Sequence, residues 1–318
     1  MKRLPAVFAF VSALCFAGLG LLPAPAGLAQ SPAAAADPTQ LWQNDLLQWR
    51  AQHERELAAP DGWLTLIGLE WLQPGVNSVG AAPDNRIRIH AKAPDHIGLF
   101  TASGQTVQLL APAGGFPPGL TIGGQPAREG PLTVDDLKPS PIAWHGLNLV
   151  VLRRGARFAL RIKDADSPTR TTFHGLNWYP PNPRLLVEAQ WIPFTPPHIE
   201  KIPTVIGTTL DLPAPGLARF KLNGKTLTLE PVLEDPSGKI LFFILRDPTS
   251  KTATYQAARF LRTPLPDNGL AHPGTLYLDF NRLENPPCAY TAYATCPLPP
   301  DQNRLPVPLE AGEKRYTP

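Results

Sequence analysis

GLARFKLNGKTLTLEPV, residues 216–232, alternates apolar and polar side chains on both sides of Asn223-Gly224. Alternation with a period of two is typical of β-strands, and Asn-Gly between two such runs is a strong signal for a two-residue hairpin turn. The stretch therefore predicts an antiparallel pair, 216–222 with 226–232, and points to a β-rich protein.

Similar patterns extend in both directions from this hairpin. A second hairpin is predicted at 147–152 and 157–163, turning at Arg154-Gly155. Further strands are expected at 63–67, 86–90, 106–109, 187–192, 201–209, 240–245 and 275–279. The 40 prolines and 25 glycines among 318 residues disfavour long helices, because both residues interrupt them.

These patterns predict an all-β, mainly antiparallel fold in two parts. A small β-sandwich is expected at 61–137 and a larger β-rich domain at 138–318, with the boundary at the proline-rich Lys138-Pro139-Ser140-Pro141. The larger domain should end in a structured loop, because the segment 277–316 combines many prolines with Asp, Asn and Arg side chains.

One helix is predicted at 37–60. Asp37 can cap its first turn, Pro38 suits that turn, and Pro60-Asp61-Gly62 ends it. An apolar side is formed by Leu41, Trp42, Leu46, Leu47 and Trp49. We expect this side to pack against a sheet through its tryptophans.

The first 29 residues have the pattern of an export signal. Lys2 and Arg3 precede an uncharged apolar run at 7–22, and Gly27-Leu28-Ala29 offers small residues for cleavage before Gln30. A membrane anchor is the alternative, although the run is at the short end for spanning. The signal predicts a periplasmic or secreted protein with no membrane span in its mature form.

The charge balance argues against two classes of partner. The sequence has 29 basic and 26 acidic side chains, so loss of Lys2 and Arg3 leaves a net charge of about +1. Nucleic-acid binding proteins carry a clear excess of basic residues. We therefore expect no nucleic acid and no anionic membrane as a partner; a small-molecule ligand remains open.

Cys288 and Cys296 are the cysteines that follow the signal. In an oxidising compartment they are expected to form a disulfide. Seven residues separate them, which is too many for a Cys-x-x-Cys redox pair. Two reduced buried thiols, metal ligation and a reactive thiol are the alternatives.

Common catalytic motifs are mostly absent from the sequence. There is no Gly-x-Ser-x-Gly, no phosphate-binding glycine loop followed by Lys-Ser/Thr, and no His-Glu-x-x-His. The seven histidines are scattered, although three of them could still converge in the folded chain. We predict no metal site and no cofactor.

Two groups of residues are candidates for a ligand site. The first lies between Arg161 and Tyr179, where aromatic and amide side chains suit stacking and hydrogen bonding. The second combines carboxylates and guanidiniums between Arg246 and Asn285. The ligand-binding candidates are Arg161, His174, Trp178, Asp247, Tyr255, Arg259, Asp279, Asn281, Arg282 and Asn285. The alternative is structural, with core aromatics in the first group and buried ion pairs in the second.

A general acid or base, if one exists, should be a carboxylate whose pKa is raised by burial. Asp247, Asp279 and Glu313 are the candidates.

The chain resembles an uncharacterised prokaryotic family, the domain of unknown function 1684. The similar segments are 61–72, 161–164, 173–180, 246–250, 258–261 and, above all, 278–300. The resemblance covers essentially the whole chain after the signal and implies no activity.

Within the first part, residues 75–80, 85–89 and His96 also look like a forkhead-associated phosphopeptide-binding sandwich. Ala81 stands where that pattern has Arg, and Pro94-Asp95 where it has Ser. The resemblance therefore implies a β-sandwich without the phosphate-binding groups.

These observations favour a binding protein for a small polar or carbohydrate-like ligand, held in a crevice of the C-terminal domain. A carboxylate-dependent hydrolase and a structural envelope protein are the alternatives.

Overall fold

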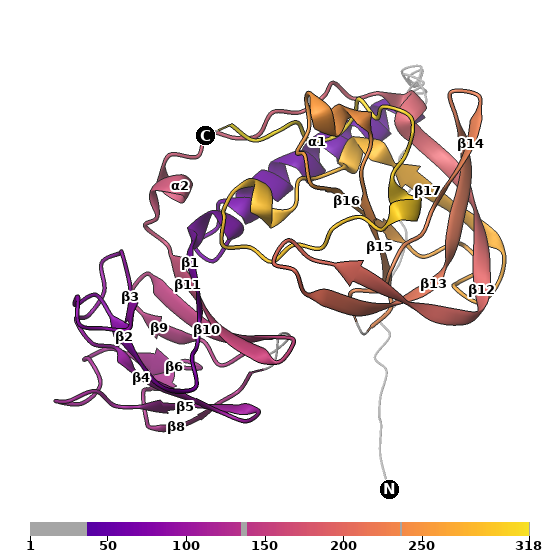
Figure 1. Ribbon diagram of the computed structural model, residues 1–318. Helices are drawn as coiled ribbons and strands as arrows, with labels where there is room; N and C mark the ends of the chain where they lie inside the picture. The colour runs from indigo at the N-terminus through magenta and orange to yellow at the C-terminus, as the bar shows by residue number, and fades with distance from the viewer. Residues whose placement is uncertain (1–36, 135–138, 236, 318) are drawn as a thin grey trace, which may run out of the picture. The chain divides into compact units, whose positions relative to one another are not determined.

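The computed structural model describes residues 37–134, 139–235 and 237–317. Over these residues the chain forms mostly antiparallel sheets with one long helix, which confirms the predicted all-β class (Figure 1). The predicted export signal at 1–29 lies outside the described residues, as does Lys138 of the predicted boundary segment.

The first β-rich part consists of two sheets. One has the order β1-β11-β10-β9-β6-β7 and the other β3-β2-β4-β5-β8. The strands of the first sheet are β1 (Leu66–Trp71), β6 (Thr121–Ile122), β7 (Gln125–Pro126), β9 (Ile142–Trp144), β10 (Leu147–Arg154) and β11 (Arg157–Asp164). Those of the second are β2 (Gly75–Gly80), β3 (Ile87–Arg88), β4 (Gly98–Ser103), β5 (Thr106–Leu110) and β8 (Gly130–Leu132).

One hydrophobic core lies between these two sheets. Val79 and Phe100 of the second sheet belong to the same buried cluster as Ile142, Leu149 and Ile162 of the first. The predicted hairpin at 147–163 is confirmed as β10 and β11. β11 also pairs with β1. The core of this part therefore contains residues that precede residues 137–138 in the sequence, such as Val79, and residues that follow them, such as Ile162.

The second β-rich part contains a four-stranded sheet and a two-stranded sheet. Their orders are β14-β13-β12-β17 and β15-β16. The strands are β12 (Leu186–Pro203), β13 (Thr209–Leu222), β14 (Lys225–Leu229), β15 (Ile240–Leu245), β16 (Arg259–Pro264) and β17 (Gly274–Asp279). Side chains of both sheets, among them Trp191, Phe220 and Phe243, share a core.

The hairpin predicted at Asn223-Gly224 is confirmed. Asn223 and Gly224 have φ angles of 50° and 75°, as a type I′ turn requires, and Leu222 pairs with Lys225. The turn fixes the register of β13 and β14.

The long helix α1 (Pro38–Leu57) confirms the predicted helix, but its buried side differs from the predicted one. Leu46, Arg50 and Leu57 are buried, whereas Leu41 and Leu47 are 56% and 48% exposed. The physical reason is that α1 lies against polar backbone. Arg50 donates hydrogen bonds from its two terminal nitrogens to the carbonyl oxygens of Tyr179 (3.0 Å) and Asn281 (3.4 Å).

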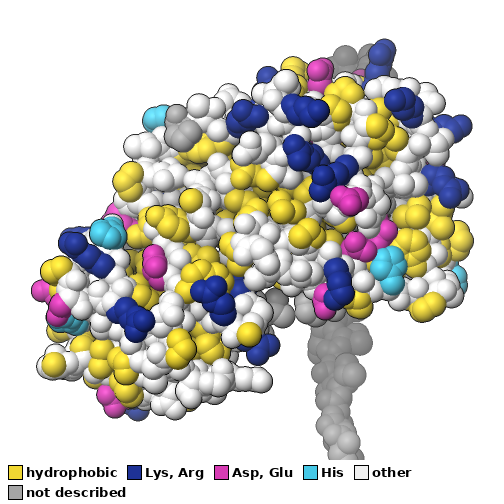
Figure 2. Space-filling view, viewed as in Figure 1, with side chains coloured by type: hydrophobic (Ala, Val, Ile, Leu, Met, Phe, Trp, Pro, Cys, Tyr) yellow, Lys and Arg dark blue, Asp and Glu magenta, His cyan; other side chains and the backbone are white. Residues whose placement is uncertain are grey.

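The other helices are single turns. They are α2 (Pro168–Thr171), η1 (Trp63–Thr65), η2 (Pro183–Leu185), η3 (Pro248–Lys251), η4 (Phe280–Arg282), η5 (Pro287–Ala289) and η6 (Asp301–Asn303). In the described part of the chain, no helix combines the length and apolar character needed to cross a membrane. Figure 2 shows basic and acidic side chains together on the viewed face, among apolar and uncharged ones.

Candidate functional site

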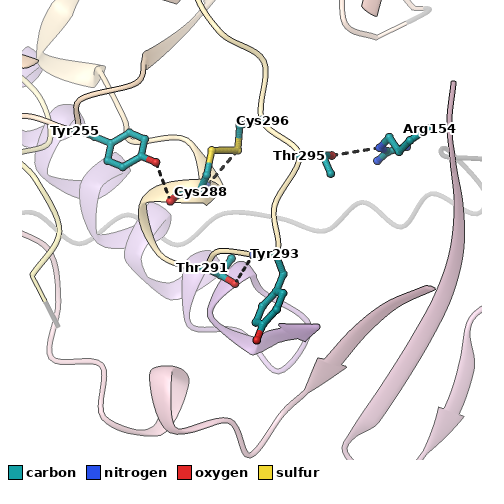
Figure 3. The surroundings of a disulfide bond; sticks show 7 residues. All are labelled: Arg154, Tyr255, Cys288, Thr291, Tyr293, Thr295 and Cys296. Atoms are coloured by element: carbon teal, nitrogen blue, oxygen red, sulfur yellow. Dashed lines mark hydrogen bonds between the residues drawn. A yellow bond between two sulfur atoms is a disulfide. The ribbon is translucent and has the colours of Figure 1, made fainter. Parts of the chain in front are cut away.

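The C-terminal loop is tied by a disulfide between Cys288 and Cys296, which confirms the predicted pairing (Figure 3). Tyr255 donates its hydroxyl hydrogen to the carbonyl oxygen of Cys288 at 3.0 Å. Thr295, next to the second cysteine, accepts a hydrogen bond from Nε of Arg154 at 3.2 Å. The loop is therefore fixed at both ends, and Tyr255 acts in holding it.

Asp247 and Arg259 form a buried ion pair, with 3.1 Å between Asp247 Oδ2 and a guanidinium nitrogen of Arg259. Arg259 also donates to the carbonyl oxygens of Leu309 and Ala311, and Asp247 accepts from the backbone N–H of Leu309. Neither residue lines the large cavity described below. Their contacts anchor the C-terminal segment, which agrees with the structural alternative for this pair.

Asp279, Asn281 and Arg282 lie at the end of β17 and in η4, facing α1. Trp42 donates its indole N–H to Asp279 Oδ2 at 2.9 Å, and Arg282 forms an ion pair with Asp45. Asn281 is buried, and its side-chain amide exchanges hydrogen bonds with the backbone of residue 182. These contacts join α1 to the chain around η4.

His53 of α1 lies between two carboxylates. Its Nδ1 is 3.3 Å from Glu284 Oε2, and its Nε2 is 3.7 Å from Glu313 Oε2. Its ring stacks on Trp49, with 5.5 Å between ring centroids. Glu284 in turn forms an ion pair with Arg262 of β16. We call His53, Glu284, Glu313 and Arg262 the His53 group.

Glu313 is held rigidly within this group. Its carboxylate is buried and accepts hydrogen bonds from the backbone and side-chain nitrogens of Asn285, at 2.8 and 2.6 Å, and from the hydroxyl of Tyr290 at 2.5 Å. Gly312, immediately before it, has a φ angle of 72° and packs against the backbone of Leu283. The close approach at Gly312 positions the following carboxylate.

Burial and neighbouring charges shift the pKa values of these groups. Burial lowers the pKa of His53, but the carboxylates of Glu313 and Glu284 outweigh it and raise that pKa above its ordinary value. Burial raises the pKa of Glu284, although the positive charges of Arg262 and His53 oppose the shift. Burial and the charge of Glu313 raise the pKa of Tyr290. Such shifts are common at functional sites.

The His53 group borders two cavities. The larger, about 1010 Å³, lies along α1 and is lined by aromatic residues together with charged ones. The aromatic lining residues are Trp42, Trp49, Trp63 and Tyr277, and the charged or titratable ones are His53, Glu56, Asp61, Arg262, Asp279, Arg282 and Glu284. A second cavity of about 520 Å³ shares His53, Glu284 and Arg262 with the first.

The remaining predicted residues have separate positions. Asn285 and Arg161 line the second cavity, and the guanidinium of Arg161 lies 5.2 Å from the ring centroid of Trp63. Trp178 donates its indole N–H to Glu54 at 2.7 Å. His174 is exposed and lines neither cavity. Of the ten candidates, Asp279 and Arg282 lie on the larger cavity.

Sequence reasoning missed His53, Glu284 and Arg262 and singled out Glu313. A signal for His53 existed, because it follows Trp49 by four positions and both therefore lie on one face of the predicted helix. Nothing in the sequence connects that face with Glu284, which lies more than 200 residues later.

Comparisons with known proteins identify a family without assigning an activity. The family described as protein of unknown function (DUF1684) matches residues 171–314. No curated protein matches the chain. The solution NMR structure of an uncharacterized protein from Haloarcula marismortui is 30% identical, with a TM-score of 0.39; the match covers 46% of this chain and 78% of that one. The chain belongs to the DUF1684 family.

Proposed function

We propose that the protein binds a small polar, carbohydrate-like ligand in the larger cavity. The observation that carries this proposal is the combination of aromatic and charged side chains in the lining of one cavity of about 1010 Å³. Its size is at the upper end of the usual range for small-molecule sites. The predicted export signal is in keeping with a ligand met outside the cytoplasm.

The lining suits a polyhydroxylated ring. Carboxylates such as Asp279 and Glu284 accept hydrogen bonds from hydroxyl groups, and guanidiniums such as Arg262 and Arg282 donate to ring or hydroxyl oxygens. Tyr277, which is 57% exposed at the cavity, offers an aromatic surface to the apolar face of a sugar.

Much of the polar lining is already oriented by ion pairs. Arg282 is paired with Asp45, and Arg262 with both Glu234 and Glu284. Preoriented polar groups lower the entropic cost of binding a ligand.

Calorimetric titration with neutral mono- and disaccharides and with sugar acids tests the proposal. We expect a saturable heat with at least one class, weakened about 10- to 100-fold by Glu284→Gln and by Arg282→Ala, because each change removes a charge-assisted hydrogen bond. Asp211→Asn, on an exposed carboxylate paired with Lys201 outside the cavity lining, is the matched control and should bind normally. Failure of every sugar to bind, or equal binding by all variants, would overturn the proposal.

A hydrolytic function is the second candidate, because His53 lies beside two carboxylates at the cavity wall. A histidine oriented by a carboxylate can take a proton from an attacking water and return it to a leaving group. If the cavity hydrolyses its ligand, His53→Gln should abolish turnover of a bound chromogenic glycoside or ester while binding persists. Unchanged turnover in His53→Gln would contradict this role.

A further inference from the structure

His198, Glu200 and Glu230 converge on one another in the four-stranded sheet. Nε2 of His198 is 2.8 Å from Glu230 Oε1 and 3.3 Å from Glu200 Oε2. Each of the three offers one atom that could bind a metal, an imidazole nitrogen or a carboxylate oxygen. In the described part of the chain, these three atoms all lie within 4.8 Å of one another. None of the three lines the cavities that border the His53 group.

The strand pairing brings the three side chains together. His198 and Glu200 are two positions apart in β12, so their side chains leave the same face of the sheet. Glu230 follows β14, which lies on the other side of β13 from β12. The three side chains therefore meet across β13.

The backbone of Glu230 is held by the side chain of Asn303. Its N–H donates to Asn303 Oδ1 at 2.8 Å, and Asn303 donates its side-chain amide back to the Glu230 carbonyl oxygen at 2.8 Å. Asn303 is buried and also donates to the carbonyl oxygen of Ile244. This support holds Glu230 in place before any ligand arrives, as in preorganised metal sites.

The surroundings of the Glu230 carboxylate also point to a ligand. Its Oε1 is shielded from solvent and lies 2.8 Å from Nε2 of His198, but this contact is not aligned as a hydrogen bond. Shielded carboxylate oxygens are normally hydrogen-bonded or bound to a metal, because an unsatisfied buried acceptor is costly.

We propose that His198, Glu200 and Glu230 bind a divalent transition metal ion, of which Zn²⁺ is the best match. One imidazole nitrogen and two carboxylate oxygens are a donor set that zinc accepts. Ligand atoms around tetrahedral zinc are about 3.3 Å apart, which is comparable with the observed separations of 2.8 and 3.3 Å. His198 is 45% exposed, so the fourth position is open to water or to an added ligand.

Isothermal titration of the metal-stripped protein with Zn²⁺ is the direct test. We expect binding of one equivalent, weakened at least about tenfold by His198→Ala and by Glu230→Gln. His272→Ala, which removes an exposed histidine outside the group, is the matched control and should leave the affinity unchanged. Circular dichroism checks that each variant is folded.

Two further measurements distinguish this site from an ordinary ion pair of protonated His198 with the glutamates. Co²⁺ should give the intense visible absorption of tetrahedral coordination, and Glu200→Gln should weaken that band. Excess Ca²⁺ should not displace the bound metal, because calcium prefers a shell made of oxygen atoms alone. Absence of stoichiometric Zn²⁺ binding, full binding by both ligand variants, or displacement by Ca²⁺ would overturn the proposal.

Discussion

Two buried or half-buried pairs of charged side chains lie in different surroundings. Arg259 and Asp247 pair with each other and with the backbone in the interior, and neither lines the cavities that border the His53 group. Glu284 and His53 are also paired, but both border the cavities. The two pairs therefore differ in their access to a cavity, although each joins a carboxylate to a basic side chain.

Gly312 and Gly269 provide a test of the packing around Glu313. Both have a φ angle of 72°, but a Cβ on Gly312 would meet the backbone of Leu283, whereas a Cβ on Gly269 would meet open space. Gly269→Ala should lower the free energy of unfolding by about 1–2 kcal/mol, the cost of this backbone conformation alone. Gly312→Ala should lower the free energy of unfolding by clearly more than Gly269→Ala, as measured by urea unfolding. Equal decreases in the two variants would contradict the close approach of Gly312 to the backbone of Leu283.

His53 should make stability depend on pH. Its folded-state pKa is raised above the ordinary value of 6.5, so the native state binds a proton more tightly than the unfolded state. The resulting stabilisation is complete below about pH 6.5 and is lost as the pH rises through the folded-state pKa. Urea unfolding measured at about pH 6 and about pH 8.5 should show this decrease.

His53→Gln should flatten this part of the profile, whereas His174→Gln, at an exposed position, should keep the wild-type slope. Glu284 acts with the same sign at lower pH, because burial raises its pKa above 4.5. A wild-type slope in His53→Gln would show that His53 is not the titrating group.

Among the elements, the sequence predicted hairpins between neighbouring strands, but it did not predict the pairing of strands that are distant in the sequence. The hairpins at 147–163 and 216–232 were predicted because each turn lies beside the strands it connects. The pairing of β11 with β1 was not, because about 90 residues separate these strands and nothing in an alternating pattern names its partner. The same limit applies to the larger cavity, because Asp279 and Arg282 of its lining were among the predicted candidates and His53 was not.

Helix α1 illustrates how packing overrides an apolar pattern. Leu46 is fully buried and Leu47 is 48% exposed, although both belonged to the predicted apolar side. Leu46→Ala should lower the free energy of unfolding by about 2–5 kcal/mol, as for other buried leucines. Leu47→Ala, the neighbouring control, should change it by less than about 0.5 kcal/mol in the same urea titration. Similar losses in both variants would contradict the described orientation of the helix.

Across the whole molecule, the disulfide loop links segments that are distant in sequence. Thr291 donates its hydroxyl hydrogen to the carbonyl oxygen of Leu66 in β1, and Thr295 accepts from Arg154 in β10. The N–H of Val205 donates to the carbonyl oxygen of Cys296 just beyond β12. The nine-residue loop thus contacts three separate strands or their ends.

The double substitution Cys288→Ser with Cys296→Ser should lower the free energy of unfolding by about 2.5 kcal/mol, from the chain-entropy estimate for a loop of this length. Urea unfolding under non-reducing conditions measures the change. The wild-type protein under reducing conditions should approach the same value. Identical stability of variant and oxidised wild type would mean that the loop is held by its hydrogen bonds alone.

The contact of α1 with the end of β17 determines how late during synthesis the larger cavity can form. Trp42 and Asp279 are 237 residues apart, and the His53 group also needs Glu313. A nascent chain can therefore form α1 early but cannot complete the larger cavity until residues as late as Glu284 have left the ribosome. Chains that end prematurely will lack the cavity, however well their earlier strands have folded.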